Sequence, residues 1–102
     1  MIYIVGPYRA TTYEGRQQNI ERARYWMLEL MRQGLTVYCP HTMTANCDGE
    51  IPDLAFIEHG LRVLPDCTDV FVLKETTPAS IGSMMELALA SRLHLNIVPE
   101  ST

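Results

Sequence analysis

Apolar residues along this chain alternate between short continuous runs and stretches in which they recur every three or four positions. Continuous runs are typical of strands buried on both faces of a parallel sheet, whereas the wider spacing is typical of helices. The runs predict strands at 2–5, 35–39, 69–73 and 95–98. The wider spacing predicts helices over about 17–33, 52–64 and 82–93. The expected order is therefore β-α-β-α-β-α-β.

Glycine and proline mark several boundaries of these elements. Gly34 follows the first helical pattern and suits a helix C-cap, and Pro52 suits the first turn of the second helix. Between the second strand and that helix, 41–53 is the longest stretch without a regular pattern. Loops of this length are often functional lids.

Strands that alternate with helices pair in parallel through right-handed crossovers. We therefore expect a small flavodoxin-like, doubly wound α/β sheet with the strand order 2-1-3-4. In this order the connections reverse direction between the first and third strands, so residues 6–9 and 74–83 flank the expected ligand crevice. No repeat or linker divides the chain, which predicts a single domain over residues 1–102.

Composition narrows the class of protein. The 102 residues are 47% hydrophobic and 20% charged, as in an ordinary globular domain. The net charge of −4 and the lack of a Lys/Arg run argue against a nucleic-acid polymer as partner, but not against single nucleotides. A domain this small benefits from covering apolar surface, so we expect a homodimer or higher homo-oligomer.

Two further exclusions concern location and cysteine chemistry. No apolar stretch approaches the roughly 20 residues of a membrane helix, and no signal-peptide pattern is present, so we expect a cytoplasmic protein without a membrane partner. Cys39, Cys47 and Cys67 are odd in number and lack CxxC spacing, which supports neither a disulfide framework nor a zinc site. We expect buried or partly buried free thiols.

The richest chemistry lies in Ser80-Ile81-Gly82-Ser83-Met84-Met85-Glu86, where small residues open a helix and a carboxylate is expected on its first turn. A helix N-terminus has unpaired N–H groups and a partial positive charge, so it can hold a phosphate and keep Glu86 ionised. The loop Gly6-Pro7-Tyr8-Arg9 is expected to face the same pocket. Together they predict an anion site with a nucleophile.

These segments resemble the nucleoside 2-deoxyribosyltransferase-like superfamily, and most closely its short members. The matching motifs are Ile2–Arg9, Asn19–Arg24, Cys39–His41, Ile51–Asp53, and Asp69–Leu73 followed by Ser80–Ser83 and Glu86. The superfamily includes deoxyribosyltransferases and nucleotide N-glycosidases, which cut the bond between base and sugar. The resemblance covers nearly the whole chain.

The resemblance implies a double displacement at the anomeric carbon of the sugar, without a metal or redox cofactor. Glu86 matches the glutamate that forms a covalent glycosyl intermediate, as the nucleophile of a retaining glycosidase does. Tyr8 matches a tyrosine that orients the nucleophile or the sugar. Ser80 and Gly82 match residues that hold the 5′-phosphate in the nucleotide-hydrolysing branch.

Further residues of the two loops complete the expected binding site. Arg9 adds a cation near the phosphate, and Gly6 and Pro7 belong to the same loop. Ser83 is expected to bind the phosphate or cap the helix, two roles that use the same free N–H groups. His41 is expected to cap the second strand or help to enclose the base.

One departure from the superfamily pattern concerns an aspartate that contacts the sugar or assists protonation of the base. Members usually carry an aspartate in the helix before the third strand, within a pattern like acidic-x-Asp-Leu, whereas this chain has Glu58-His59-Gly60-Leu61. Either His59 or Glu58 replaces that aspartate, or Asp53 or Asp48 reaches in from the preceding loop, or the chemistry has weakened.

Three hypotheses for the function follow. The leading one is an N-glycosidase or deoxyribosyltransferase acting on a nucleoside or a nucleoside 5′-monophosphate, with nucleotide hydrolysis favoured by Ser80 and Gly82. The second is a nucleotide-binding module that has lost turnover, and the last is an interaction domain with no small-molecule site. On the first hypothesis, Glu86→Ala is expected to abolish base release and preserve the fold, as a substitution of a helix-surface carboxylate.

Overall fold

A computed structural model describes residues 1–101 and contains one four-stranded, all-parallel sheet. Its strands, in the spatial order β2-β1-β3-β4, confirm the predicted topology. They are β1 (Ile2–Val5), β2 (Val37–Tyr38), β3 (Asp69–Val72) and β4 (Asn96–Pro99).

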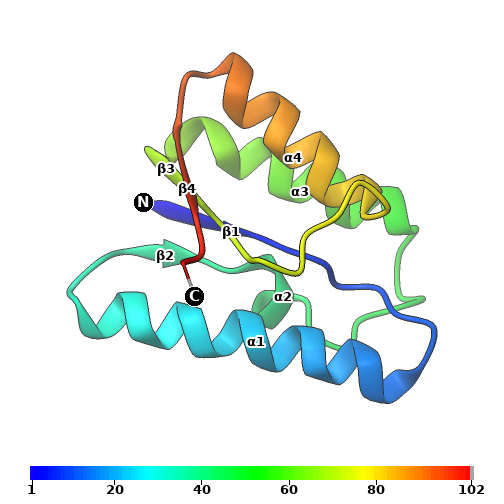
Figure 1. Cartoon of the computed structure of the whole chain (residues 1–102). Coiled ribbons are helices and arrows are strands. Elements are labelled where there is room, and N and C mark those ends of the chain that lie inside the picture. The colour runs from blue at the N-terminus through cyan, green and yellow to red at the C-terminus, as the bar shows by residue number, and fades with distance from the viewer. Residues whose placement is uncertain (102) are drawn as a thin grey trace.

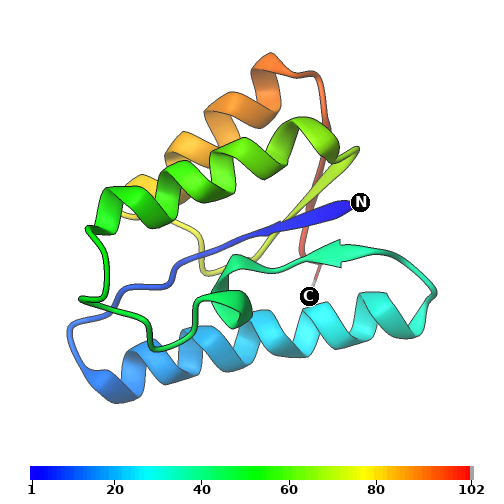
Figure 2. The same ribbon diagram turned by 180° about the vertical axis from the view of Figure 1, so that it is seen from behind.

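Helices cover both faces of this sheet, which makes it doubly wound as predicted (Figures 1 and 2). They are α1 (Tyr13–Arg32), α2 (Pro40–Met43), α3 (Asp53–Val63), the 3-10 helix η1 (Leu64–Asp66) and α4 (Ile81–Arg92). In Figure 1, α1 lies along one face while α3 and α4 lie side by side on the other. None of these helices, within residues 1–101, is both long and apolar enough to cross a membrane.

The hydrophobic core consists of two layers, one on each side of β1 and β3. Tyr3 and Val5 face α3 and α4 and are fully buried, whereas Ile4, between them, packs with residues of α1. Val70 and Phe71 alternate in the same way on β3. This double burial explains why both strands are unbroken apolar runs in the sequence.

The first helix begins at Tyr13 and not at about 17 as predicted. Thr12 is its N-cap, with an Oγ1 that accepts a hydrogen bond of 3.0 Å from the N–H of Gly15. The apolar spacing becomes visible only from Ile20, the first buried residue of the helix, so the pattern placed the start too late. At the other end, Gly34 follows the last residues of α1 with a φ of 85°, which confirms the prediction that this glycine terminates the helix.

The second strand and the loop after it also differ from the prediction. β2 has only Val37 and Tyr38, because Leu35 still closes α1 through a hydrogen bond to Leu30 and Pro40 begins α2. The stretch 41–53 is therefore not wholly irregular. Four residues are too short a helix to produce a recognisable apolar period.

The predicted bounds of β1, β3, β4, α3 and α4 are confirmed to within one residue at each end. The 3-10 helix η1 directly continues α3. All three cysteines are free, with Cys39 and Cys67 buried and Cys47 partly buried, as expected. The first residues of α1, α3 and α4 lie at the right-hand side of Figure 1, toward which β1 and β3 run. The loops that follow the strands therefore share one edge of the sheet.

Candidate active site

A cavity of about 550 Å³ opens at this carboxyl edge of the sheet. Its walls come from the loop after β1, from the end of β2, from α2 and the loop that follows it, from the loop before α4, and from the first two turns of α3 and α4. Every residue predicted for the site lines it: Gly6, Pro7, Tyr8, Arg9, His41, His59, Ser80, Gly82, Ser83 and Glu86. The parallel topology thus brings together segments that are far apart in the sequence.

Glu86 lies on the second turn of α4, so its predicted place on the first turn is wrong. The helix begins at Ile81. The side chain is not on the helix surface either, because it turns toward the sheet and is largely buried. There the hydroxyl of Tyr3 donates a hydrogen bond to Glu86 Oε2. A carboxylate is therefore held at the edge of the core and still lines the cavity.

Burial raises the pKa of Glu86 to about 7, although the hydrogen bond from Tyr3 acts in the opposite direction. The expectation that the helix N-terminus keeps this carboxylate ionised is therefore wrong, since the loss of hydration dominates. Burial and the neighbouring Glu86 raise the pKa of Tyr3 well above its ordinary value. The Tyr3 hydroxyl thus stays protonated and remains a donor, while Glu86 exchanges its proton near neutral pH.

Tyr3 and Gly60 are two residues of the site that sequence reasoning missed. Tyr3 is fully buried on β1, and α3 passes directly over its hydroxyl at Gly60. A Cβ on residue 60 would overlap that hydroxyl and would lie 3.4 Å from Glu86 Oε2. A glycine inside a helix costs about 1 kcal/mol relative to alanine, so its presence was a signal that a close approach required it.

Tyr8 lines the cavity, but its hydroxyl holds the loop after α2. It donates a hydrogen bond of 2.5 Å to Asp48 Oδ1 and accepts one of 3.1 Å from the N–H of Asn46. Burial and the hydrogen bond to Asp48 raise the pKa of Tyr8. In this structure Tyr3, and not Tyr8, makes the hydrogen bond to Glu86, so of the two predicted roles of Tyr8 only the orientation of the sugar stays a prediction.

The same loop is tied to the start of α1 by other polar contacts. Gln17 donates to the side-chain oxygen of Asn46 at 2.6 Å, and Arg16 lies 3.7 Å from Asp48. These contacts, with those of Tyr8, fix the loop as one wall of the cavity, to which Thr44 and Asp48 contribute. The stretch 41–53, predicted as a lid, is thus held in place as a wall of the cavity.

His41 supports the loop that carries Tyr8 and Arg9. The ring is almost fully buried, and burial lowers its pKa, so the imidazole is neutral at neutral pH. Its Nε2 lies 2.9 Å from the carbonyl oxygen of Gly6, which can only accept, so Nε2–H is the donor. At the mouth of the cavity Arg9 forms an ion pair of 2.5 Å with Asp53, and both side chains are exposed.

The first turn of α4 forms another wall. Ser80 takes the N-cap position predicted for it, but its hydroxyl donates to Ser83 Oγ at 2.7 Å and makes no capping bond to the backbone. Ser83 is buried beneath it. A Cβ on Gly82 would be in ordinary contact with Ile57, at 3.5 Å, so sterics alone do not require glycine there.

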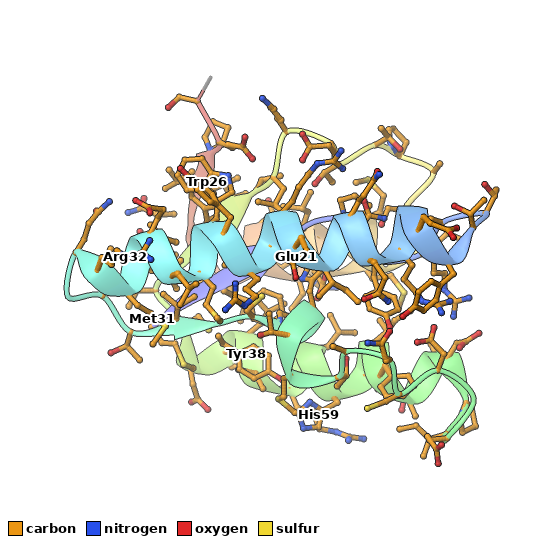
Figure 3. All side chains as sticks on the ribbon, turned by 90° about the horizontal axis from the view of Figure 1, so that it is seen from below. Glu21, Trp26, Met31, Arg32, Tyr38 and His59 are labelled. Carbon is orange, nitrogen blue, oxygen red and sulfur yellow. The ribbon has the colours of Figure 1, made fainter. Side chains whose placement is uncertain are left out.

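His59 stands on α3 beside Tyr38 of β2 (Figure 3). The rings stack at an interplanar angle of 29°, and the Tyr38 hydroxyl lies 3.1 Å from His59 Nδ1. Among the alternatives for the absent aspartate, Asp48, Asp53 and His59 line the cavity, whereas Glu58 does not. In residues 1–101, no three His, Cys, Asp or Glu side chains gather in an arrangement that could hold a metal ion.

Comparison with known proteins adds a family. No curated protein is significantly similar to this sequence. A family model described as "Domain of unknown function (DUF7768)" matches residues 1–99. Because that match spans almost the whole sequence, the chain belongs to the DUF7768 family.

Proposed function

We propose that this protein cleaves the bond between base and sugar in a nucleoside or a nucleoside 5′-monophosphate, with Glu86 as the nucleophile. The observation that carries the proposal is the largely buried Glu86 carboxylate, held by Tyr3 at the wall of a large cavity. The motifs that resemble the nucleoside 2-deoxyribosyltransferase-like superfamily support the same reaction.

The environment of Glu86 suits attack on an anomeric carbon. Tyr3 engages Oε2, while Oε1 has no hydrogen bond within residues 1–101 and is the oxygen we assign to the attack. With a pKa of about 7, a substantial fraction of the carboxyl groups is ionised at neutral pH. Partial removal from water strengthens the attraction between this charge and a sugar that develops positive charge in the transition state.

The cavity suits a nucleotide in size and charge. Its volume of about 550 Å³ lies within the usual range for pockets that take small molecules. The first turn of α4 offers backbone N–H groups and the Ser80 hydroxyl, a combination that binds phosphate. We therefore favour a 5′-monophosphate over a free nucleoside as the substrate.

The proposed reaction has two steps. Glu86 Oε1 forms a bond to C1′ while the bond from C1′ to the base nitrogen breaks, and its electron pair leaves with the base. Water then attacks C1′ and releases Glu86 as a carboxylate. If a second base were held in place of that water, the same intermediate would give transfer instead of hydrolysis.

A nucleotide-binding module without turnover is the second candidate. The feature that favours it is Gly60, which stands where the superfamily pattern has its aspartate and leaves no carboxylate there. Such a protein would retain the cavity and the phosphate-binding turn of α4 but would not release a base.

Base release from a panel of ribo- and deoxyribonucleosides and their 5′-monophosphates, resolved by chromatography, separates the two candidates. We expect release from one substrate class, faster with the phosphate than without it. Ser80→Ala is expected to raise the KM of the monophosphate and leave that of the nucleoside unchanged. If calorimetry shows nucleotide binding but no base appears, the binding module is correct. If neither binding nor release occurs, both candidates are wrong.

A further inference from the structure

We propose that His59 is the general acid that protonates the departing base, and that Tyr38 holds its ring for this task. This inference rests on the proposed function and adds the proton donor that the reaction needs. A neutral base leaves a sugar far more readily than an anionic one, so protonation by a positioned group accelerates such reactions by about 10²–10⁴-fold.

The other groups that could replace the absent aspartate are already engaged. Glu58 lies outside the cavity, 3.9 Å from Arg62 on the same helix. Asp48 accepts the Tyr8 hydroxyl and lies 3.7 Å from Arg16, and a proton on its carboxylate would remove the charge that attracts this arginine.

Asp53 forms an ion pair with Arg9 at the mouth of the cavity, so protonation would break that pair. His59, by contrast, lines the cavity and makes no ion pair within residues 1–101. Of the four candidates, His59 alone combines a place at the cavity with a proton that it can give without losing an ionic partner.

The contact with Tyr38 suits a group that changes its protonation state. When the imidazole is protonated, its Nδ1–H donates to the Tyr38 hydroxyl across the 3.1 Å contact. Once Nε2 has lost its proton, Nδ1–H keeps this hydrogen bond, and the bare Nε2 can take a proton back. Nε2 therefore carries a proton in the protonated state and is the atom we assign to the transfer, while the stacked Tyr38 ring limits its rotation.

His59 is also coupled in space to the nucleophile. The ring of Tyr38 lies 5.4 Å from that of Tyr3, whose hydroxyl binds Glu86. Burial, and after it the charge of Glu86, raise the pKa of Tyr38. Gly60, the next residue after His59, fixes α3 against the same pair. Acid and nucleophile thus stand on adjacent helices at one cavity, as two groups do in retaining glycosidases.

His59 gives up one proton in the first step and regains one in the second, so both catalytic groups return to their starting states. In the first step His59 Nε2–H gives its proton to a ring nitrogen of the base as the bond to C1′ breaks, and Glu86 forms its ester with C1′. The imidazole is then neutral. In the second step Nε2 takes a proton from the water whose oxygen attacks C1′, and the Glu86 carboxylate is released.

The test compares leaving groups that need a proton with one that does not. The probes are the nucleoside 5′-monophosphates of the panel and the 4-nitrophenyl glycosides of ribose 5-phosphate and 2-deoxyribose 5-phosphate, which release a stable phenolate. We expect His59→Gln to slow base release by about 10²–10⁴-fold while 4-nitrophenolate release stays near the native rate. Tyr38→Phe, which retains the stacked ring, is expected to show a smaller loss with the same selectivity.

Glu58→Gln is the matched control, since it removes a titratable group next to His59 but outside the cavity, and neither rate should change. Equal losses on both kinds of probe in His59→Gln would show a structural role and overturn the inference. Unchanged base release would do so as well, because the acid would lie elsewhere. If the native protein released nothing from any probe, the proposed function itself would fail, and His59 would lose its role with it.

Discussion

Replacing Glu86 with glutamine is expected to reduce base release by on the order of 10⁴-fold or more, because an amide oxygen is a poor nucleophile toward C1′. Glutamine has nearly the same shape, and its side-chain oxygen can still accept the hydrogen bond from Tyr3. It is therefore a sharper test than alanine, which would leave the buried Tyr3 hydroxyl without a partner.

The same variant is expected to be more stable than the native protein above pH 7. Glu86 has a pKa of about 7 in the folded protein and an ordinary value of 4.5 when unfolded, so between these values the folded state binds more protons. The free energy of unfolding therefore falls as pH rises from about 4.5 to about 7, by up to about 3 kcal/mol. Glutamine removes this loss. Urea unfolding between pH 4.5 and 8 measures it.

Glu21→Gln is the control for both measurements, because Glu21 is an exposed residue of α1 (Figure 3) and does not line the cavity. It is expected to change neither base release nor the dependence of stability on pH. Base release at the native rate in Glu86→Gln would remove Glu86 from the mechanism. Parallel stability curves for this variant and the native protein would show that folding does not raise the pKa of Glu86.

Gly60→Ala is expected to disturb the contact between Tyr3 and Glu86 from the side of α3. The added methyl group would overlap the hydroxyl of Tyr3, whose side chain is fully buried and cannot move aside. Either α3 moves outward or Tyr3 loses its contact with Glu86. We expect a loss of about 1–3 kcal/mol in the free energy of unfolding, although alanine is the better helix former. Thermal and urea unfolding measure this loss.

The activity of Gly60→Ala is expected to respond through the pKa of Glu86. The hydrogen bond from Tyr3 lowers that pKa, so weakening the bond raises it and moves the rise of kcat/KM to higher pH. Tyr3→Phe is expected to move the profile in the same direction. Glu58→Ala, on the exposed side of the same helix, is the control and should leave the profile unchanged. A native profile and native stability in Gly60→Ala would contradict the proposed packing.

The sequence predicted the sheet and the cavity because both follow from patterns that extend over several residues. β1 and β3 are apolar runs buried on both faces, and their connections set the strand order. The order in turn predicted that the loop after β1 and the start of α4 would meet. The short helix α2 was missed because four residues carry no apolar period.

The contacts inside the site could not be predicted in this way. In the sequence, Tyr3 is one aromatic residue in a buried strand, and nothing nearby identifies the partner of its hydroxyl. That partner depends on how closely α3 passes at Gly60 and on where α4 begins, and the first residue of a helix is uncertain by a residue or two. Moving Glu86 from the first turn to the second changed its expected environment from a helix end to the edge of the core.

Trapping the glycosyl intermediate tests the central claim most directly. A nucleoside 5′-monophosphate with fluorine at C2′ slows both steps, because fluorine withdraws electrons from the positively charged transition state. Mass spectrometry of the intact and digested protein should then show one fluorinated sugar phosphate on the peptide that contains Glu86, and none in Glu86→Gln. Release of the base with no adduct, or with the adduct on another residue, would contradict Glu86 as the nucleophile.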